Sequence, residues 1–189
     1  VDPDFIFGIG RRIRNIHQIL RHNFYSETSD AFFDKHGERT FKDRMIDVAF
    51  IDGLHTYGQS LKDFKNCLKY LSSDGIILLH DCNPQSEAAA ANVTSPQEMI
   101  EKFPEAKFEW LGDVWKTIVH IRSLYKDMEA FVLDCDHGVG VVRPGKSESY
   151  LDFTESDIQK LEYRDLNENR NAFLNLKAPE YLDKFISRL

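Results

Sequence analysis

Two kinds of hydrophobic pattern alternate along the chain. Residues 46–51 and 76–80 are mainly apolar runs, with Asp47 inside the first and His80 at the end of the second, whereas residues 58–71 carry apolar side chains at spacings of three and four. The runs indicate strands and the spaced pattern indicates an amphipathic helix. A strand, a helix and a second strand of these lengths form a crossover unit, in which the strands lie parallel and the connection is right-handed. Parallel strands are buried on both faces, which explains the absence of polar alternation.

Further elements are predicted on both sides of this unit. An apolar stripe predicts a helix over 11–21, and a short strand over 23–26 precedes a helix that Thr28, Ser29 and Asp30 can cap. Two more strands, 130–133 and 138–142, are joined by a stretch rich in turn-forming residues, so we predict an antiparallel hairpin. Other helices are predicted to begin at Ser95-Pro96, to follow Asp113, and to cover 154–163 and 179–189.

These elements predict an α/β fold with three layers, a Rossmann-like sheet that is mostly parallel and ends in an antiparallel hairpin. With 189 residues, of which 42% are hydrophobic, the chain suits one core. We expect residues 1–150 to form this domain and residues 151–189 to be a helical extension packed on it. The alanine-rich segment 84–94 is expected to be a loop or a weakly held helix that could cover a pocket.

Charge and cysteine content narrow the classes of function. The net charge is −7, and no basic stripe is present to neutralise phosphates, which argues against nucleic acid as a partner. The three cysteines lack the spacing of a zinc site or a disulfide framework. No apolar run is long enough for a membrane span, and no signal peptide is visible, so we expect a cytoplasmic protein without a membrane partner.

Polar side chains follow both strands of the crossover unit. Asp52 and His55 come after the first strand, and His80 and Asp81 come at the end of the second. The carboxyl ends of parallel strands meet at one edge of a sheet, where open α/β sheets bind ligands. We therefore expect these four side chains to lie close together as a catalytic site, with either histidine able to act as a general base.

Each of these residues also has an alternative interpretation. A histidine can be a structural or exposed residue, and the two aspartates can hydrogen-bond to loop amides. A carboxylate directly after a buried strand costs free energy unless it has a partner, and this makes Asp52 the sharpest functional candidate. Tyr57 can stack on a ligand or begin the helix, whereas Trp110 and Trp115 are expected in the core.

The same residues resemble a known family. The segments Ile51-Asp-Gly-Leu-His-Thr-Tyr57 and Asp74-Gly-Ile-Ile-Leu-Leu-His-Asp81 resemble the fourth and fifth strands of class I S-adenosylmethionine-dependent methyltransferases, in the branch acting on small molecules. The resemblance continues through 112–116 and 132–143 and covers roughly residues 45–145. It implies transfer of a methyl group to oxygen, or to nitrogen, of a small-molecule acceptor such as a sugar or secondary metabolite.

The resemblance also implies a set of binding residues. Asp2 would accept hydrogen bonds from the ribose of S-adenosylmethionine, and Ser29 and Asp30 would face its adenine, although both can instead be helix-capping residues. Asp52 and Gly53 would lie beside the cofactor. Asp52 and Asp81 would hold a divalent metal such as Mg²⁺, but the asparagine expected directly after Asp81 is displaced by Cys82 to position 83.

One departure from the family is a missing glycine-rich turn. Gly8 and Gly10 form the only G-x-G sequence, and it lies after Asp2 rather than before it. We therefore expect the first strand to precede Val1, leaving an unpaired edge on 46–51 and S-adenosylmethionine binding no tighter than about 1 mM. Two alternatives remain open: a non-catalytic interaction module of this fold, and a metal-dependent oxygenase that uses His and Asp ligands.

Overall fold

The computed structural model describes residues 23–93, 95–104 and 110–188. The chain divides into two compact units, residues 1–45 and residues 46–189, and each is considered by itself. Asp2, Gly8, Gly10 and the predicted helix 11–21 lie outside the described residues.

The described part of the first unit is a short helical run. It consists of α3 (Ser29–Phe32), the π-helix η3 (Phe33–Gly37) and α4 (Glu38–Phe41). The side chain of Thr28 accepts a hydrogen bond from the amide of Ala31 at 3.3 Å and caps α3. The capping role predicted for Ser29 and Asp30 therefore belongs to Thr28, and those two residues occupy the first turn.

The predicted strand at 23–26 is wrong, because these residues have no regular secondary structure and pair with no strand of the sheet. Tyr25 instead packs against the helical run. Its ring lies 4.6 Å from the ring of Phe32 and 5.2 Å from that of His36, measured between centroids. The aromatic side chain that suggested a strand thus contributes to a local cluster.

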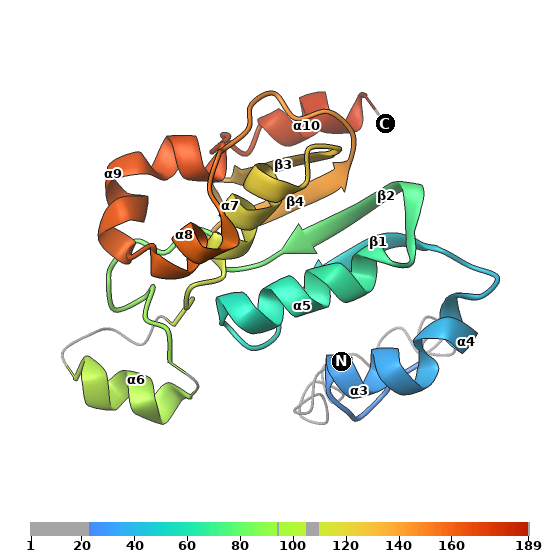
Figure 1. Cartoon of the computed structure of the whole chain (residues 1–189), viewed down its shortest axis with the longest axis horizontal. Helices are drawn as coiled ribbons and strands as arrows, with labels where there is room; N and C mark the ends of the chain where they lie inside the picture. Colours follow the sequence, from blue (N-terminus) through green and yellow to red (C-terminus); the bar gives the residue numbers. More distant parts are fainter. Residues whose placement is uncertain (1–22, 94, 105–109, 189) are drawn as a thin grey trace, which may run out of the picture. The chain divides into compact units, whose positions relative to one another are not determined.

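The second unit is built on a four-stranded mixed sheet. Its strands are β1 (Ile46–Ile51), β2 (Leu71–Leu79), β3 (Met128–Leu133) and β4 (Val139–Pro144). The order in the sheet is β1-β2-β4-β3 (Figure 1). β1 and β2 are parallel, and β4 is antiparallel to both of its neighbours. The structure confirms the parallel pair and the antiparallel hairpin, and three of the four strands point in one direction.

The crossover helix α5 (Tyr57–Leu68) begins where the side chain of Thr56 accepts a hydrogen bond from the amide of Gln59, at 3.3 Å. It ends three residues earlier than the pattern predicts, because Leu71 already belongs to β2. Leu71 is nevertheless buried and continues the apolar stripe of the helix. Leu71 therefore fits the helical period although it is the first residue of β2.

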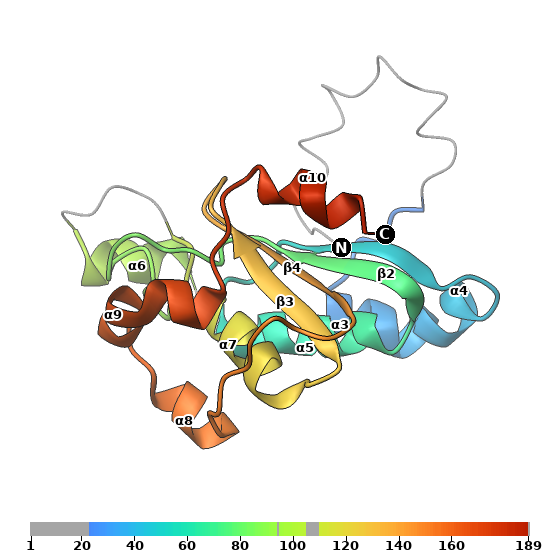
Figure 2. The same ribbon diagram turned by 90° about the horizontal axis from the view of Figure 1, so that it is seen from above.

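Helices cover both faces of the sheet. α5 and α7 (Trp115–Leu124) lie on one face, and α10 (Tyr181–Ile186) lies on the other (Figures 1 and 2). Phe185 of α10 is buried in a cluster with residues of β3 and β4. This arrangement confirms the predicted three-layer α/β fold.

The remaining helices are α6 (Pro96–Lys102), α8 (Glu155–Lys160) and α9 (Tyr163–Leu174). The pattern did not predict α9, which is rich in asparagine and is interrupted by a non-helical residue, Asn169. Arg122 of α7 holds α9 in place by donating hydrogen bonds to the carbonyl oxygens of Ala172 and Phe173. These two hydrogen bonds attach α9 to α7.

β1 is an edge strand of the described sheet. Val48 and Phe50 are 64% and 58% exposed, although they pair in register with Ile76 and Leu78 of β2. An exposed apolar edge of this kind invites pairing with another strand. Within the part of the chain that the structure describes, no helix has both the length and the apolar character needed to cross a membrane.

Burial of His120, in α7, makes stability depend on pH. The Tyr57 hydroxyl lies 2.7 Å from Nδ1 of His120. Burial lowers the pKa of His120, and the charge of Lys65 lowers it further. Because the folded-state pKa lies below the unfolded value of 6.5, His120 contributes stability that is present above pH 6.5 and is lost as the pH falls through the folded pKa.

We expect His120→Asn to remove this dependence. The free energy of unfolding of the wild type should fall more steeply than that of the variant between pH 7 and pH 5, by about 1.4 kcal/mol for each unit of pKa difference. Urea unfolding at several pH values measures it, with the value at pH 8 as the reference for each protein. Parallel curves for the two proteins would contradict the assignment.

Candidate active site

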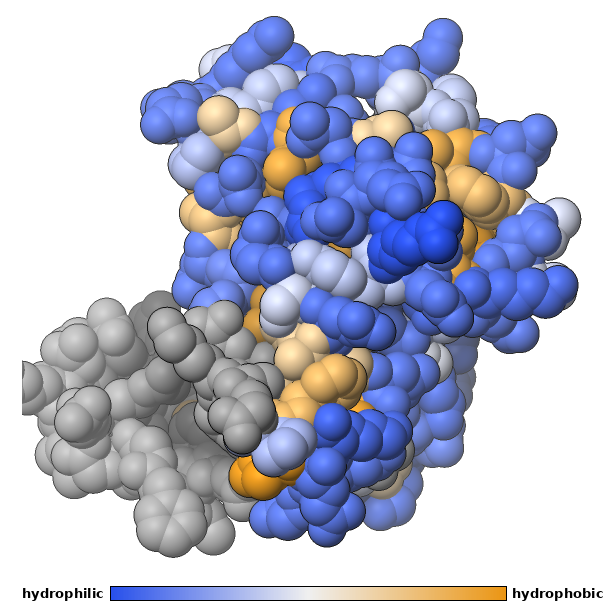
Figure 3. Space-filling model, turned by 90° about the vertical axis from the view of Figure 1, so that its left-hand side faces the viewer, coloured by the Kyte–Doolittle hydropathy of each residue, from blue (hydrophilic) through white to orange (hydrophobic). Residues whose placement is uncertain are grey.

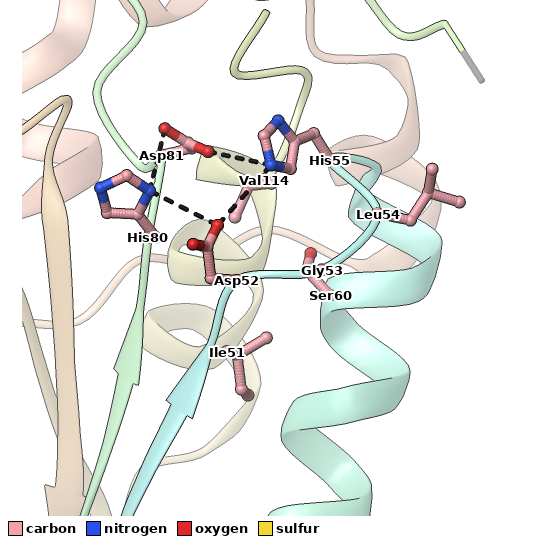
Figure 4. A pocket seen from close by; sticks show the side chains of 9 residues that line it. All are labelled: Ile51, Asp52, Gly53, Leu54, His55, Ser60, His80, Asp81 and Val114. Carbon is pink, nitrogen blue, oxygen red and sulfur yellow. Dashed lines mark ion pairs between the residues drawn. The ribbon is translucent and has the colours of Figure 1, made fainter. Parts of the chain in front are cut away.

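Four side chains predicted to form a site converge at the ends of β1 and β2 (Figure 4). Asp52 follows β1 directly, His80 and Asp81 follow β2, and His55 lies on the short loop that leads into α5. Register explains the convergence, since Ile51 pairs with Leu79 and the following residues leave the sheet side by side. Ile51, Ser60 and Val114 line the same pocket.

His55 is held from both sides of its ring. Its Nδ1 lies 2.6 Å from the carbonyl oxygen of Trp110, and because a carbonyl only accepts, this nitrogen carries a proton. Its Nε2 lies 3.1 Å from Oδ2 of Asp81 and 3.7 Å from Oδ1 of Asp52. The hydrogen bond to Trp110 therefore turns Nε2 toward the carboxylates.

His80 faces carboxylates at both ring nitrogens. Its Nδ1 lies 3.2 Å from Oδ1 of Asp81 and 3.5 Å from Oδ1 of Asp52, and its Nε2 lies 3.4 Å from Oδ2 of Asp136. Partial burial lowers the pKa of His80, but the three carboxylates outweigh it and raise that pKa above its usual value. This surrounding favours an imidazolium with both nitrogens donating.

Asp81 bridges the two histidines with its two carboxylate oxygens. It is 5% exposed, and burial raises its pKa, an effect that the nearby His55 and His80 oppose. Its φ angle is +60°, a conformation that costs free energy for a residue with a side chain. Asp52, by contrast, is exposed and presents its carboxylate at the mouth of the pocket.

The loop before α7 packs closely against the main chain of His55. Gly112 has a φ angle of +63°, and a Cβ atom there would lie 1.6 Å from the carbonyl oxygen of His55. The neighbouring Asp113 was predicted to cap the helix that follows it, but α7 has no side-chain cap. Instead Oδ1 of Asp113 accepts a hydrogen bond from the amide of Tyr57, at 2.6 Å, and so caps α5.

Asp113 also accepts a hydrogen bond from Asn92 and pairs with the buried Lys116 at 3.3 Å. We expect Asp113→Asn to reduce the free energy of unfolding by about 2 kcal/mol, since an amide keeps one acceptor but loses the charge that pairs with Lys116. Asp152→Asn, at an exposed position, is the matched control and should change stability little. Equal effects of the two substitutions in urea unfolding would contradict this role.

Asn83 does not face the carboxylates in the way a metal-binding amide would. Its Oδ1 accepts a hydrogen bond from Arg170, and its Nδ2 donates to Asp134 at 2.9 Å. It is 3% exposed and ties α9 to the turn after β3. Three other side chains are close enough together to bind one cation. Asp52, His80 and Asp81 each offer one ligand atom, and these three atoms lie within 4.8 Å of one another.

Of the other predicted binding residues, Gly53 lines the same pocket as Asp52. Ser29 and Asp30 lie in α3 of the first unit, and Asp2 lies outside the described residues. Gly53 is next to Asp52 on an exposed loop, and a Cβ atom there would make only ordinary contact, 3.6 Å from Asp63. Internal packing therefore does not require a glycine at position 53, and the loop stays open to a ligand.

Two contributors were not identified from the sequence. Asp136 reaches His80 from the β3–β4 turn, which was recognised only as a turn, and Trp110 supplies the carbonyl that orients His55. The rings of Trp110 and His55 also lie 5.1 Å apart between centroids, so Trp110 borders the site rather than the core. Trp115 and Tyr57 are buried, as expected for a core residue and a helix start.

The surface around this end of the sheet is mainly hydrophilic. Figure 3 shows the side toward which β1 and β2 point, with small apolar areas between polar ones. The site adds the exposed carboxylates of Asp52 and Asp136 to this surface, above the buried Asp81, which gives it acidic character. Such a site suits a ligand with positive charge or with hydroxyl groups that donate hydrogen bonds.

Part of the chain is similar to a known protein family. Residues 9–82 match a family described as a methyltransferase domain. The match ends one residue after Asp81 and so includes all four residues of the cluster. No curated protein matches the chain.

Proposed function

We propose, on the match of residues 9–82 to a family described as a methyltransferase domain, that the chain transfers a methyl group from S-adenosylmethionine to an oxygen of a small molecule. The observation that carries the proposal is the cluster of Asp52, His55, His80 and Asp81, which lies within the matched residues at the sheet end where this class of fold binds ligands. Nitrogen is the less favoured acceptor atom.

The donor set fits the cofactor chemically. S-adenosylmethionine would supply an activated methyl group on a cationic sulfonium, and an acidic site attracts a cation. Asp52 and Gly53, on the exposed loop after β1, would hold the cofactor on the sheet unit. Asp2, Ser29 and Asp30 are proposed to contribute the remaining contacts, on the family resemblance alone.

His55 is the proposed general base. Because its Nδ1 donates to the carbonyl of Trp110, Nε2 is the nitrogen that can exchange a proton with an acceptor hydroxyl. His80 is less suited, since carboxylates face both of its nitrogens. Asp52, exposed at the mouth of the pocket, would accept a hydrogen bond from the acceptor. Asp81, 3.1 Å from Nε2 of His55, would stabilise the imidazolium that forms when Nε2 takes the proton.

A divalent metal is a second proposal, carried by the three ligand atoms of Asp52, His80 and Asp81 within 4.8 Å of one another. Two carboxylates and one imidazole suit Mn²⁺ or Fe²⁺ better than Mg²⁺, which prefers oxygen ligands. Calorimetric titration with Mg²⁺, Mn²⁺ and Fe²⁺ compares them. Loss of binding in Asp52→Asn and Asp81→Asn would support the site, whereas tight Fe²⁺ binding alone would favour the oxygenase alternative.

Product analysis tests the reaction. The longest protein whose sequence contains this chain is incubated with S-adenosylmethionine labelled in its methyl group and a panel of sugars and phenols. We expect S-adenosylhomocysteine to form in an amount equal to the methylated acceptor, with the label on oxygen. Absence of turnover across the panel, despite cofactor binding, would instead support the non-catalytic module.

A further inference from the structure

The β3–β4 turn, residues 134–138, enters the site from a part of the chain outside the matched residues 9–82. Of this turn, Asp136 reaches the cluster most directly, with its Oδ2 3.4 Å from Nε2 of His80. The ring of His137 lies 6.3 Å from that of His80, between centroids. His80 therefore lies between the aspartates of the sheet end on one edge of its ring and the turn on the other.

Backbone contacts hold this turn against the segment that follows β2. The amide of Cys82 donates to the carbonyl of Gly138 at 2.9 Å, and the amide of Asn83 donates to the carbonyl of His137 at 2.8 Å. A Cβ atom on Gly138 would lie 2.4 Å from Cβ of Asn83, so the two segments are in close contact. The position of the turn relative to His80 is thus set by the main chain.

The conformation of the turn is one that few residues adopt. Asp136 and His137 have φ angles of +44° and +61°, in the left-handed region where asparagine, aspartate and glycine are most easily accommodated. Such conformations are kept where the surrounding structure determines them, and they gather at functional sites. In this turn they direct the carboxylate of Asp136 toward Nε2 of His80, whose Nδ1 already lies near the carboxylates of Asp52 and Asp81.

We propose that Asp136 is a positioning residue for the methyl transfer proposed above. Its carboxylate accepts a hydrogen bond from Nε2 of His80 and fixes the ring, so that Nδ1 faces Asp52 and Asp81. Without Asp136, rotation of the imidazole about its bond to Cβ releases both aspartates from His80. Asp81 is the partner of His55, so His80 and Asp136 act on the proposed base through it.

Asp136→Gly is the substitution of choice, because glycine keeps the left-handed backbone while the carboxylate is lost. Asp136→Asn keeps both the backbone and an acceptor oxygen and serves as the conservative variant. Asp127→Asn removes the same charge at the other end of β3, in an exposed position without a contact to the site, and is the matched control.

The first readout does not require catalysis. Long-range ¹H–¹⁵N correlation spectra at a single pH report the Nε2 resonance of His80. We expect it to move in Asp136→Gly, to remain near its wild-type position in Asp136→Asn, and to be unchanged in Asp127→Asn. The Nδ1 resonance of the distant His120 checks that the fold is intact. An unmoved His80 resonance in Asp136→Gly would overturn the proposal.

The second readout uses the labelled-methyl assay. We expect Asp136→Gly to lower kcat about tenfold, with the KM for S-adenosylmethionine unchanged, and Asp136→Asn to recover most of the loss. Unchanged kcat in Asp136→Gly would refute the positioning role while leaving methyl transfer intact. A shifted His80 resonance in a protein that does not turn over S-adenosylmethionine would refute the proposed function instead and leave the contact established.

Discussion

Gly112→Ala is expected to reduce the free energy of unfolding by about 3 kcal/mol, because it combines two costs. A side chain is strained at the φ angle of +63°, and its Cβ atom would lie 1.6 Å from the carbonyl oxygen of His55. That oxygen belongs to the main chain, so the loop itself must move. The displacement should also disturb the hydrogen bond between His55 and Trp110, which are neighbours of this contact.

Gly58→Ala is the matched control for this substitution. Gly58 lies in the first turn of α5, and a Cβ atom there would meet nothing within 4 Å. Alanine is the better helix former, so this variant should be neutral or stabilised by up to about 1 kcal/mol. Urea unfolding of both variants at one pH makes the comparison. Similar stability of the two proteins would show that Gly112 is not required by its contact with His55.

The elements that the sequence predicts correctly are those determined by the spacing of apolar and turn-forming residues close together in the chain. Residues 46–79 carry strand, helix and strand in direct succession, so the period of the apolar residues determines both the element types and the parallel pairing. The hairpin, predicted with strands at 130–133 and 138–142 and observed at 128–144, is recognisable for the same reason, since its turn residues are adjacent in the chain. The convergence of Asp52 with Asp81 followed from the parallel pairing alone.

What the sequence did not reveal depends on contacts between distant segments. Asp113 has the form of a cap for its own helix but caps a helix 56 residues earlier in the chain. The local sequence does not distinguish Asp136 from the other polar residues of its turn, and only the folded hairpin brings it close to His80. Asn83 resembled a displaced metal ligand, yet Arg170, from a helix with little apolar pattern, occupies its carbonyl oxygen.

His55→Asn is expected to cause the largest loss of activity, a decrease in kcat of about 10²- to 10⁴-fold, as for removal of a general base. Asparagine can keep the hydrogen bond to the Trp110 carbonyl through its amide, because Nδ2 takes the place of Nδ1, while Nε2, the atom proposed to take the proton, is lost. The KM for S-adenosylmethionine should change little. His80→Asn removes Nε2 of His80 in the same way. Comparing the two variants shows which histidine contributes more to kcat.

The kinetics of labelled methyl transfer by the wild type, His55→Asn and His80→Asn therefore test the central claim most directly. The account predicts that His55→Asn loses at least ten times more of kcat than His80→Asn and that both retain cofactor affinity. A His55→Asn enzyme with near wild-type kcat, or a larger loss in His80→Asn, would contradict the assignment of His55 as the base.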